Sequence, residues 1–139
     1  MRGVLEGLRI VIVDDDADAR ELLATILTQR NAAVFAAECA AEAFAILRRE
    51  RPDVLISDIA MPEEDGYMLI RRVRALPVHE GGRTPSLAVT AYAGRPDRMR
   101  ALEAGFDGHF AKPIDVESLV GSLLDIRSMR DLRIAPKTP

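Results

Sequence analysis

Short apolar segments alternate along the chain with longer segments whose apolar residues recur at helical spacing. The first short segment, residues 9–13, is β-branched and almost wholly apolar, as is typical of a strand buried on both faces of a sheet. Together with weaker signals of the same kind, it predicts strands at residues 9–13, 33–36, 53–57, 87–90 and 108–111. The amphipathic segments between and after them predict helices at residues 17–29, 40–49, 64–76, 96–104 and 116 to about 129.

Five strand–helix units in succession predict an α/β fold, a doubly wound parallel sheet with helices on both faces. The chain has 139 residues, which corresponds to one domain. Prolines and glycines concentrate in residues 76–86, so we expect the one long loop there. We find no internal repeat and no low-complexity tract.

The composition and the net charge of the chain argue against several classes of function. The net charge of −3 provides no global basic field, so we expect no direct binding of nucleic acid. A single cysteine, Cys39, excludes an internal disulfide and fits a reducing, cytoplasmic setting. The most apolar stretch, residues 32–47, is interrupted by Glu38 and Glu42, so we expect no insertion into a membrane, and residues 1–7 lack the apolar run of a signal peptide.

Polar residues follow the predicted strands at the ends where a parallel sheet binds ligands. Three carboxylates, Asp14 to Asp16, come directly after the first strand. Later strands are followed or ended by Asp58, Thr90 and Lys112. Neighbouring carboxylates repel one another and are costly to desolvate, so the cluster calls for a cation. Asp16 is the best candidate for an ordinary helix N-cap, which leaves Asp14 and Asp15 for the cation.

These residue types suit phosphoryl transfer. Asp15 and Asp58, with a backbone carbonyl and waters, offer the oxygen ligands that Mg²⁺ prefers. A carboxylate beside Mg²⁺ can attack a phosphoryl group and form an aspartyl phosphate. Lys112 and the Thr90 hydroxyl can then stabilise the charge on the transferred oxygens. Glycine-rich phosphate-binding loops are absent from the sequence.

Over roughly residues 8–126 the chain resembles the receiver domain of two-component response regulators, proteins of the CheY type. The matching motifs, in chain order, are Ile12-Val13-Asp14-Asp15-Asp16, Ser57-Asp58-Ile59-Ala60-Met61-Pro62 with Asp65-Gly66, Val89-Thr90-Ala91 and Lys112-Pro113. The resemblance implies a flavodoxin-like strand order of 2-1-3-4-5. It also implies a cis bond before Pro113, and a turn at Asp65-Gly66 that leads into the third helix.

The resemblance assigns a role to each site residue. Asp58 is the implied phosphoacceptor. The implied Mg²⁺ ligands are Asp14, Asp15, Asp58 and the backbone carbonyl of Ala60. The implied switch hydroxyl belongs to Thr90, and Lys112 is the implied partner of the phosphate.

Three positions depart from the common pattern of the family. His109 stands where an aromatic residue often acts as a second switch, and it is a candidate for that role. Phe110 is next to it but points to the opposite face of the strand. Ala60 and Tyr92 occupy positions that border the attacking water in the family. Ala60 has no side-chain group to orient water and Tyr92 can cover the phosphate, so we expect a slowly hydrolysing aspartyl phosphate.

Residues 104–114 look most like receivers of hybrid sensor histidine kinases. We expect an N-terminal lead-in at residues 1–7, the receiver at 8–126, and a C-terminal extension or tail at 127–139. The implied partner is a histidine kinase or a histidine phosphotransfer protein. The last two helices are the implied switching surface and a candidate homodimer surface.

Two other functions fit parts of the sequence. Asp14 and Asp16 after an apolar strand also fit the opening motif of a phosphatase of the haloacid dehalogenase type, with Asp14 as nucleophile, but Asp58 then has no role. A degenerate receiver that only binds proteins is the second alternative. The complete set of three acids, a threonine and a lysine argues against it.

Overall fold

In the computed structural model, the described residues are 3–92 and 94–134. The five strands are β1 (Arg9–Val13), β2 (Ala33–Ala37), β3 (Val54–Asp58), β4 (Ser86–Thr90) and β5 (Gly108–Ala111). The five α-helices are α1 (Ala17–Thr28), α2 (Ala40–Glu50), α3 (Gly66–Arg74), α4 (Arg95–Ala104) and α5 (Val116–Ile134). A single 3₁₀ turn, η1 (Val78–Glu80), lies in the predicted long loop. None of the described helices has an apolar stretch long enough to cross a membrane.

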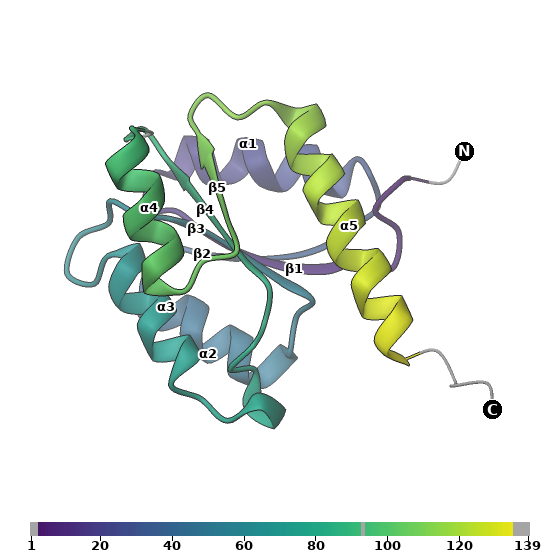
Figure 1. Cartoon of the computed structure of the whole chain (residues 1–139). Helices are drawn as coiled ribbons and strands as arrows, with labels where there is room; N and C mark the ends of the chain where they lie inside the picture. Colours follow the sequence, from purple (N-terminus) through teal and green to yellow (C-terminus); the bar gives the residue numbers. More distant parts are fainter. Residues whose placement is uncertain (1–2, 93, 135–139) are drawn as a thin grey trace.

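The strands form one parallel sheet in the order β2-β1-β3-β4-β5, as predicted. Helices α1 and α5 cover one face, and α2, α3 and α4 cover the other (Figure 1). Each connection returns to the same edge of the sheet, as parallel strands require. The carboxyl ends of all five strands therefore lie at one edge.

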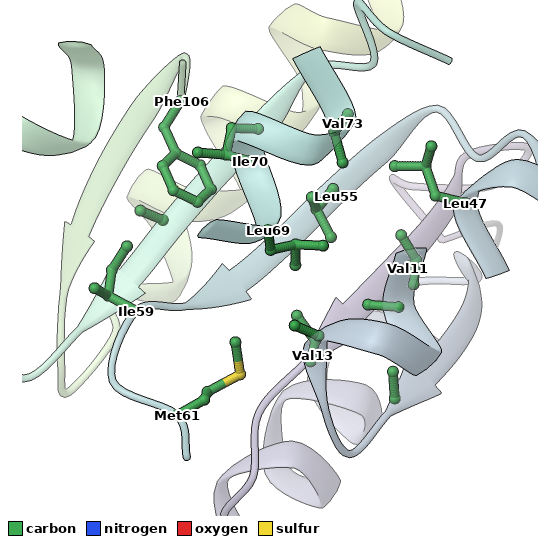
Figure 2. Packing of buried hydrophobic residues seen from close by; sticks show 14 of the residues in the cluster. Val11, Val13, Leu47, Leu55, Ile59, Met61, Leu69, Ile70, Val73 and Phe106 are labelled. Atoms are coloured by element: carbon green, nitrogen blue, oxygen red, sulfur yellow. The ribbon is translucent and has the colours of Figure 1, made fainter. Parts of the chain in front are cut away.

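Alternation along the strands builds two apolar cores. Val11 and Leu55 face α2 and α3, where they pack with Leu69 and other residues in the cluster drawn in Figure 2. Ile10 and Ile56 point to the other face and pack in a second cluster with residues of α1 and α5. Strands buried on both faces explain why β1 and β3 give near-continuous apolar signals in the sequence.

Two element boundaries differ from the prediction near the acidic edge of the sheet. Asp58 is the last residue of β3 rather than the first residue after it. Helix α3 begins at Gly66 rather than at Glu64, because the Asp65 carboxylate accepts a hydrogen bond from the Met68 amide at 2.9 Å and caps the helix.

Helix α5 is longer than predicted and runs to Ile134 instead of ending near Met129. Its additional turns are attached to the N-terminal segment. Arg127 donates to the Val4 carbonyl at 2.6 Å, and Arg130 donates to the Gly7 carbonyl at 2.9 Å and to Asp53 at 3.0 Å. Leu5 in that segment is fully buried in the second core cluster. Residues 4–7 of the predicted lead-in and residues 127–130 of the predicted tail are thus packed against the domain, whereas residues 1–2 and 135–139 lie outside the described residues.

Arg74 holds the long loop between α3 and β4 in place. Its guanidinium donates to the carbonyls of Gly105 (2.9 Å), Gly82 (3.0 Å) and Thr84 (2.8 Å), and to the Asp107 carboxylate at 3.0 Å. Burial lowers the pKa of Arg74, and the attraction of Asp107 offsets part of that effect. One cation thus joins the end of α3 to the loops before β4 and β5.

We predict that Arg74→Met lowers the free energy of unfolding by about 2–3 kcal/mol, because it removes four hydrogen bonds that join α3 to the loops before β4 and β5. Urea unfolding monitored by circular dichroism measures this change. Arg71→Met, at an exposed position on the same helix, is the matched control and should change stability by less than about 0.5 kcal/mol. Equal effects of the two substitutions would contradict the assigned role of Arg74.

Candidate functional site

Three predicted carboxylates meet at the carboxyl edge of the sheet. Strand β1 pairs with β3 so that Val13 lies beside Ser57, which brings Asp14 next to Asp58. Asp14, Asp15 and Asp58 each offer an oxygen atom, and these atoms lie within 4.8 Å of one another. Asp14 and Asp58 are each only 8% exposed, whereas Asp15 is exposed. The edge therefore carries a concentrated and partly desolvated negative charge.

Lys112 supplies the nearest positive charge. Its ammonium group lies 2.9 Å from Asp14 Oδ2 and 3.2 Å from Asp58 Oδ2, so it donates to both carboxylates. The peptide bond from Lys112 to Pro113 is cis, as the sequence predicted. A lysine at the end of β5 thus reaches across to β1 and β3, two positions that are far from it in sequence.

The charges shift the pKa values of the central pair. Burial raises the pKa of Asp58, and the neighbouring Asp14 raises it further, while Lys112 acts in the opposite direction. Burial alone would lower the pKa of Lys112, but its hydrogen bond to Asp14 and the attraction of both carboxylates raise that pKa. An additional cation at this edge would favour the ionised form of Asp58.

Backbone groups fix the orientation of the two buried carboxylates. Asp58 Oδ1 accepts a hydrogen bond from the Ile59 amide at 2.7 Å, and Asp14 Oδ1 accepts one from the Asp16 amide at 2.9 Å. Asp16 itself caps α1 through the amides of Asp18 and Ala19, as predicted. The run of three acids therefore divides into one helix cap and two acids that face the site.

Arg20 takes part in the site in a way that the sequence did not indicate. Its guanidinium donates to the Asp14 carbonyl at 2.8 Å and lies 3.6 Å from Glu38. It thereby ties the loop after β1 to the loop after β2. The only signal in the sequence is a cationic residue in the second turn of the helix that follows the acidic run.

Gly66 allows α3 to begin directly against the phosphoacceptor candidate. A Cβ atom at this position would lie 2.5 Å from the Asp58 carbonyl oxygen and 2.9 Å from Ile59 Cα. The Gly66 amide donates to the Ile59 carbonyl at 2.8 Å. Only glycine fits this close approach, which gives the Asp65-Gly66 pair of the sequence a structural reason.

Thr90 is the last residue of β4 and is almost fully buried. Its hydroxyl oxygen accepts a hydrogen bond from the Tyr92 amide at 3.1 Å. Among the described residues, no hydrogen bond joins this hydroxyl to Asp58 or Lys112. The Tyr92 side chain is 66% exposed at the rim of the site. Thr90 is thus buried at the end of β4, and Tyr92 is exposed on the loop that follows it.

His109 lies on β5 beside Ala88 of β4, on the face covered by α3 and α4. Its Nε2 atom is buried and has no hydrogen-bond partner within the part of the chain that the structure describes. Phe110 packs in the opposite core cluster, as strand alternation predicted. An unsatisfied buried nitrogen is costly, so this ring has a reason to change its position.

The donor set fits Mg²⁺. Hard divalent cations take carboxylate and carbonyl oxygens, and the three acids present such oxygens within one coordination sphere. Ala60, whose carbonyl was predicted as a further ligand, is exposed two residues after Asp58. Its role as a ligand remains a prediction.

The fold and this arrangement of acids, hydroxyl and lysine agree with one family. Residues 10–124 match the family described as response regulator receiver domain. The chain belongs to this family.

Related sequences place this receiver among both small and large proteins. It is 47% identical over 116 residues to an uncharacterised 14.6 kDa protein of Leptolyngbya boryana, covering 84% of this chain and 87% of that protein. It is also 30% identical over 131 residues to hybrid signal transduction histidine kinase D of Dictyostelium discoideum, covering 90% of this chain but only 8% of that kinase. The receiver therefore corresponds to a small part of the second relative.

Solved structures agree with the fold. A putative response regulator from Chloroflexus aurantiacus aligns with a TM-score of 0.81 and 32% identity, covering 87% of this chain and 98% of that chain. The family match covers all the strand-end residues named above, and the phosphatase alternative leaves Asp58 without a role.

We predict that Asp58→Asn stabilises the protein at pH 7 in the absence of divalent ions. Because the pKa of Asp58 is raised on folding, the folded state binds the proton more tightly than the unfolded chain. The ionised carboxylate therefore lowers stability above the folded pKa and has no such effect at low pH. We expect a gain of about 1 kcal/mol in the free energy of unfolding at pH 7 that disappears near pH 3.

Urea unfolding at the two pH values measures the gain. Asp16→Asn is the matched control, because asparagine preserves the helix cap at an exposed position and should leave stability unchanged. A loss of stability on Asp58→Asn at pH 7 would show that Lys112 outweighs the desolvation and repulsion at Asp58.

Proposed function

We propose that Asp58 accepts a phosphoryl group from a phosphohistidine of a partner protein in a Mg²⁺-dependent reaction. The observation that carries this proposal is the position of the Asp58 carboxylate, which lies between the acids Asp14 and Asp15 and the ammonium group of Lys112. This carboxylate accepts a hydrogen bond from the Ile59 amide and lines a cavity beside α1.

The proposed transfer makes one bond and breaks one. An oxygen of Asp58 attacks the phosphorus, the bond from phosphorus to the histidine nitrogen breaks, and the imidazole leaves with the electron pair. Mg²⁺, held by Asp14, Asp15, Asp58 and the Ala60 carbonyl, supplies charge compensation for the phosphoryl oxygens. The Lys112 ammonium group then leaves the Asp58 carboxylate and pairs with a second phosphoryl oxygen. The Thr90 hydroxyl donates a hydrogen bond to a third phosphoryl oxygen.

A groove beside the site suits the donor protein. A cavity of about 170 Å³ lies between α1 and the start of the loop after β5, and Asp58 and Lys112 lie at its base. Its walls include Ile26, Ile114 and the 63% exposed Leu22. An apolar wall next to the acceptor would dock a helix of a histidine kinase or histidine phosphotransfer protein. The hybrid kinase among the relatives is a protein of that signalling class.

Phosphorylation would then change the surface formed by α4, β5 and α5. Donation by Thr90 to the phosphoryl group pulls this residue toward Asp58 and frees space beneath the loop after β4. His109, whose buried Nε2 has no hydrogen-bond partner within the described residues, would then move into that space. The altered surface would bind the output partner or a second receiver.

We predict that incubation with Mg²⁺ and acetyl phosphate adds one phosphoryl group, about 80 Da by intact mass, to the wild-type protein and none to Asp58→Asn. Chelation of Mg²⁺ with EDTA should abolish the addition. After the donor is removed, the adduct should decay slowly, because Ala60 has no side-chain group to orient the attacking water and Tyr92 can cover the phosphate.

Each alternative gives a different result in the same assay. Hydrolysis of a phosphate ester that persists in Asp58→Asn and is lost in Asp14→Asn would indicate the phosphatase. A wild-type protein that gains no mass with Mg²⁺ and acetyl phosphate would indicate the degenerate receiver. Asp16→Asn, outside the acidic pocket, is the control that should be labelled like the wild type.

A further inference from the structure

A second groove lies at the opposite end of the sheet from Asp58. It runs between the C-terminal half of α5 and the loops that precede β3 and β4. Asp53, directly before β3, lies in it, whereas Asp58 is the last residue of the same strand. Its volume of about 450 Å³ is in the range of binding sites in proteins. We call it the basal groove.

One wall of the basal groove is the extended end of α5. Ile126, Met129 and Arg133 line the groove from this helix. The bonds of Arg130 to the Gly7 carbonyl and to Asp53 hold the helix against the body of the domain. The predicted part of α5 thus supplies Ile126 and Met129, and the additional turn supplies Arg130 and Arg133.

The other wall is the loop that contains η1. Arg51 donates to the His79 carbonyl, and Arg74 donates to the carbonyls of Gly82 and Thr84. Three backbone carbonyls of one loop are thus fixed by two arginines from neighbouring helix ends. A groove with both walls fixed is preorganised, which lowers the entropic cost of binding.

Two apolar side chains stand on the rim. Val78 of η1 is 66% exposed and Met129 of α5 is 54% exposed, and both line the groove. Because they lie at the rim rather than on the floor, a small molecule bound at the floor would leave them in water. A segment that lies across the groove would cover both.

The free charges of the groove favour an anionic occupant. Arg83 and Arg133 are exposed, and neither guanidinium has a hydrogen bond or ion pair within the described residues. Asp53 and Asp107 already have partners in Arg130 and Arg74. Asp125 is the one carboxylate of the groove without a partner in the described part of the chain. The charged groups of the groove that lack a partner in the described part of the chain are therefore two guanidinium groups and one carboxylate.

We propose that the basal groove binds an extended peptide segment of a partner protein in which acidic residues alternate with apolar ones. The apolar side chains cover Val78 and Met129, and the carboxylates pair with Arg83 and Arg133. A second copy of this chain fits less well, because a symmetric contact would place the two arginines of one groove against those of the other. Binding here leaves the acidic pocket at Asp58 free for its own reaction.

The experiment is an NMR titration of the ¹⁵N-labelled protein with the tetrapeptide acetyl-Leu-Glu-Leu-Glu-amide. We expect saturable shifts at the amides of Val78, Arg83, Met129 and Arg133. Arg83→Glu and Arg133→Glu should each weaken binding about fivefold or more, whereas Asp125→Asn should strengthen it about twofold by removing a repulsion. Arg98→Glu, an exposed arginine on α4 outside the groove, is the matched control and should change nothing.

A charge exchange provides the strictest test. The double variant Arg83→Glu, Arg133→Glu should bind acetyl-Leu-Lys-Leu-Lys-amide better than it binds the acidic peptide. The ¹⁵N spectrum of each variant should keep the dispersion of the wild-type spectrum, which shows that the variant is folded by a readout that does not depend on the proposed phosphoacceptor.

Three results would overturn the proposal. The first is the absence of saturable shifts in the groove at millimolar peptide. The second is binding that is insensitive to the charge of Arg83 and Arg133. The third is sedimentation showing that wild-type protein self-associates without peptide and that both charge reversals abolish this, since the occupant would then be a second copy.

Discussion

The ammonium group of Lys112 is the contact on which the site depends. Two buried carboxylates, Asp14 and Asp58, approach each other because β1 and β3 are neighbours in the sheet. Their repulsion and desolvation are offset only in part by one cation that hydrogen-bonds to both, so the pKa of Asp58 stays raised. The third acid, Asp15, has no hydrogen bond to Lys112 in the described part of the chain. The carboxyl edge of the sheet therefore retains negative charge that a divalent metal can neutralise. The local stability of the site and the proposed phosphoryl chemistry thus depend on the same charges.

The opposite edge of the sheet is organised by arginines. Arg74 donates to backbone carbonyls of two separate segments and to Asp107, and Arg130 donates to the Gly7 carbonyl and to Asp53. Guanidinium groups can do this because they present several donors in one plane, which an ammonium group cannot. The result is a rigid base from which the strands present their carboxyl ends. It is also the reason that the basal groove has fixed walls.

The fold and the three acids of the pocket could be predicted from the sequence, because the buried strands and the residues at their ends follow from short periodic signals. Buried β-branched runs located β1 and β3, and their ends located Asp14 and Asp58. Contacts that join distant segments could not be found in this way. Arg20 on the Asp14 carbonyl and Arg130 on the Gly7 carbonyl are surface-type residues with no periodic signal. For the same reason the end of α5 was placed too early, since its last turns are held by such contacts rather than by an apolar face.

The most direct test of this account is the effect of Mg²⁺ on the free energy of unfolding. We predict that Mg²⁺ at ten times its dissociation constant stabilises the wild-type protein by about 1.4 kcal/mol relative to NaCl of equal ionic strength. Asp15→Asn, at an exposed position, should remove most of this gain while the protein remains folded. Equal stabilisation of both proteins, or none beyond that of NaCl, would contradict a metal centre at the acidic edge.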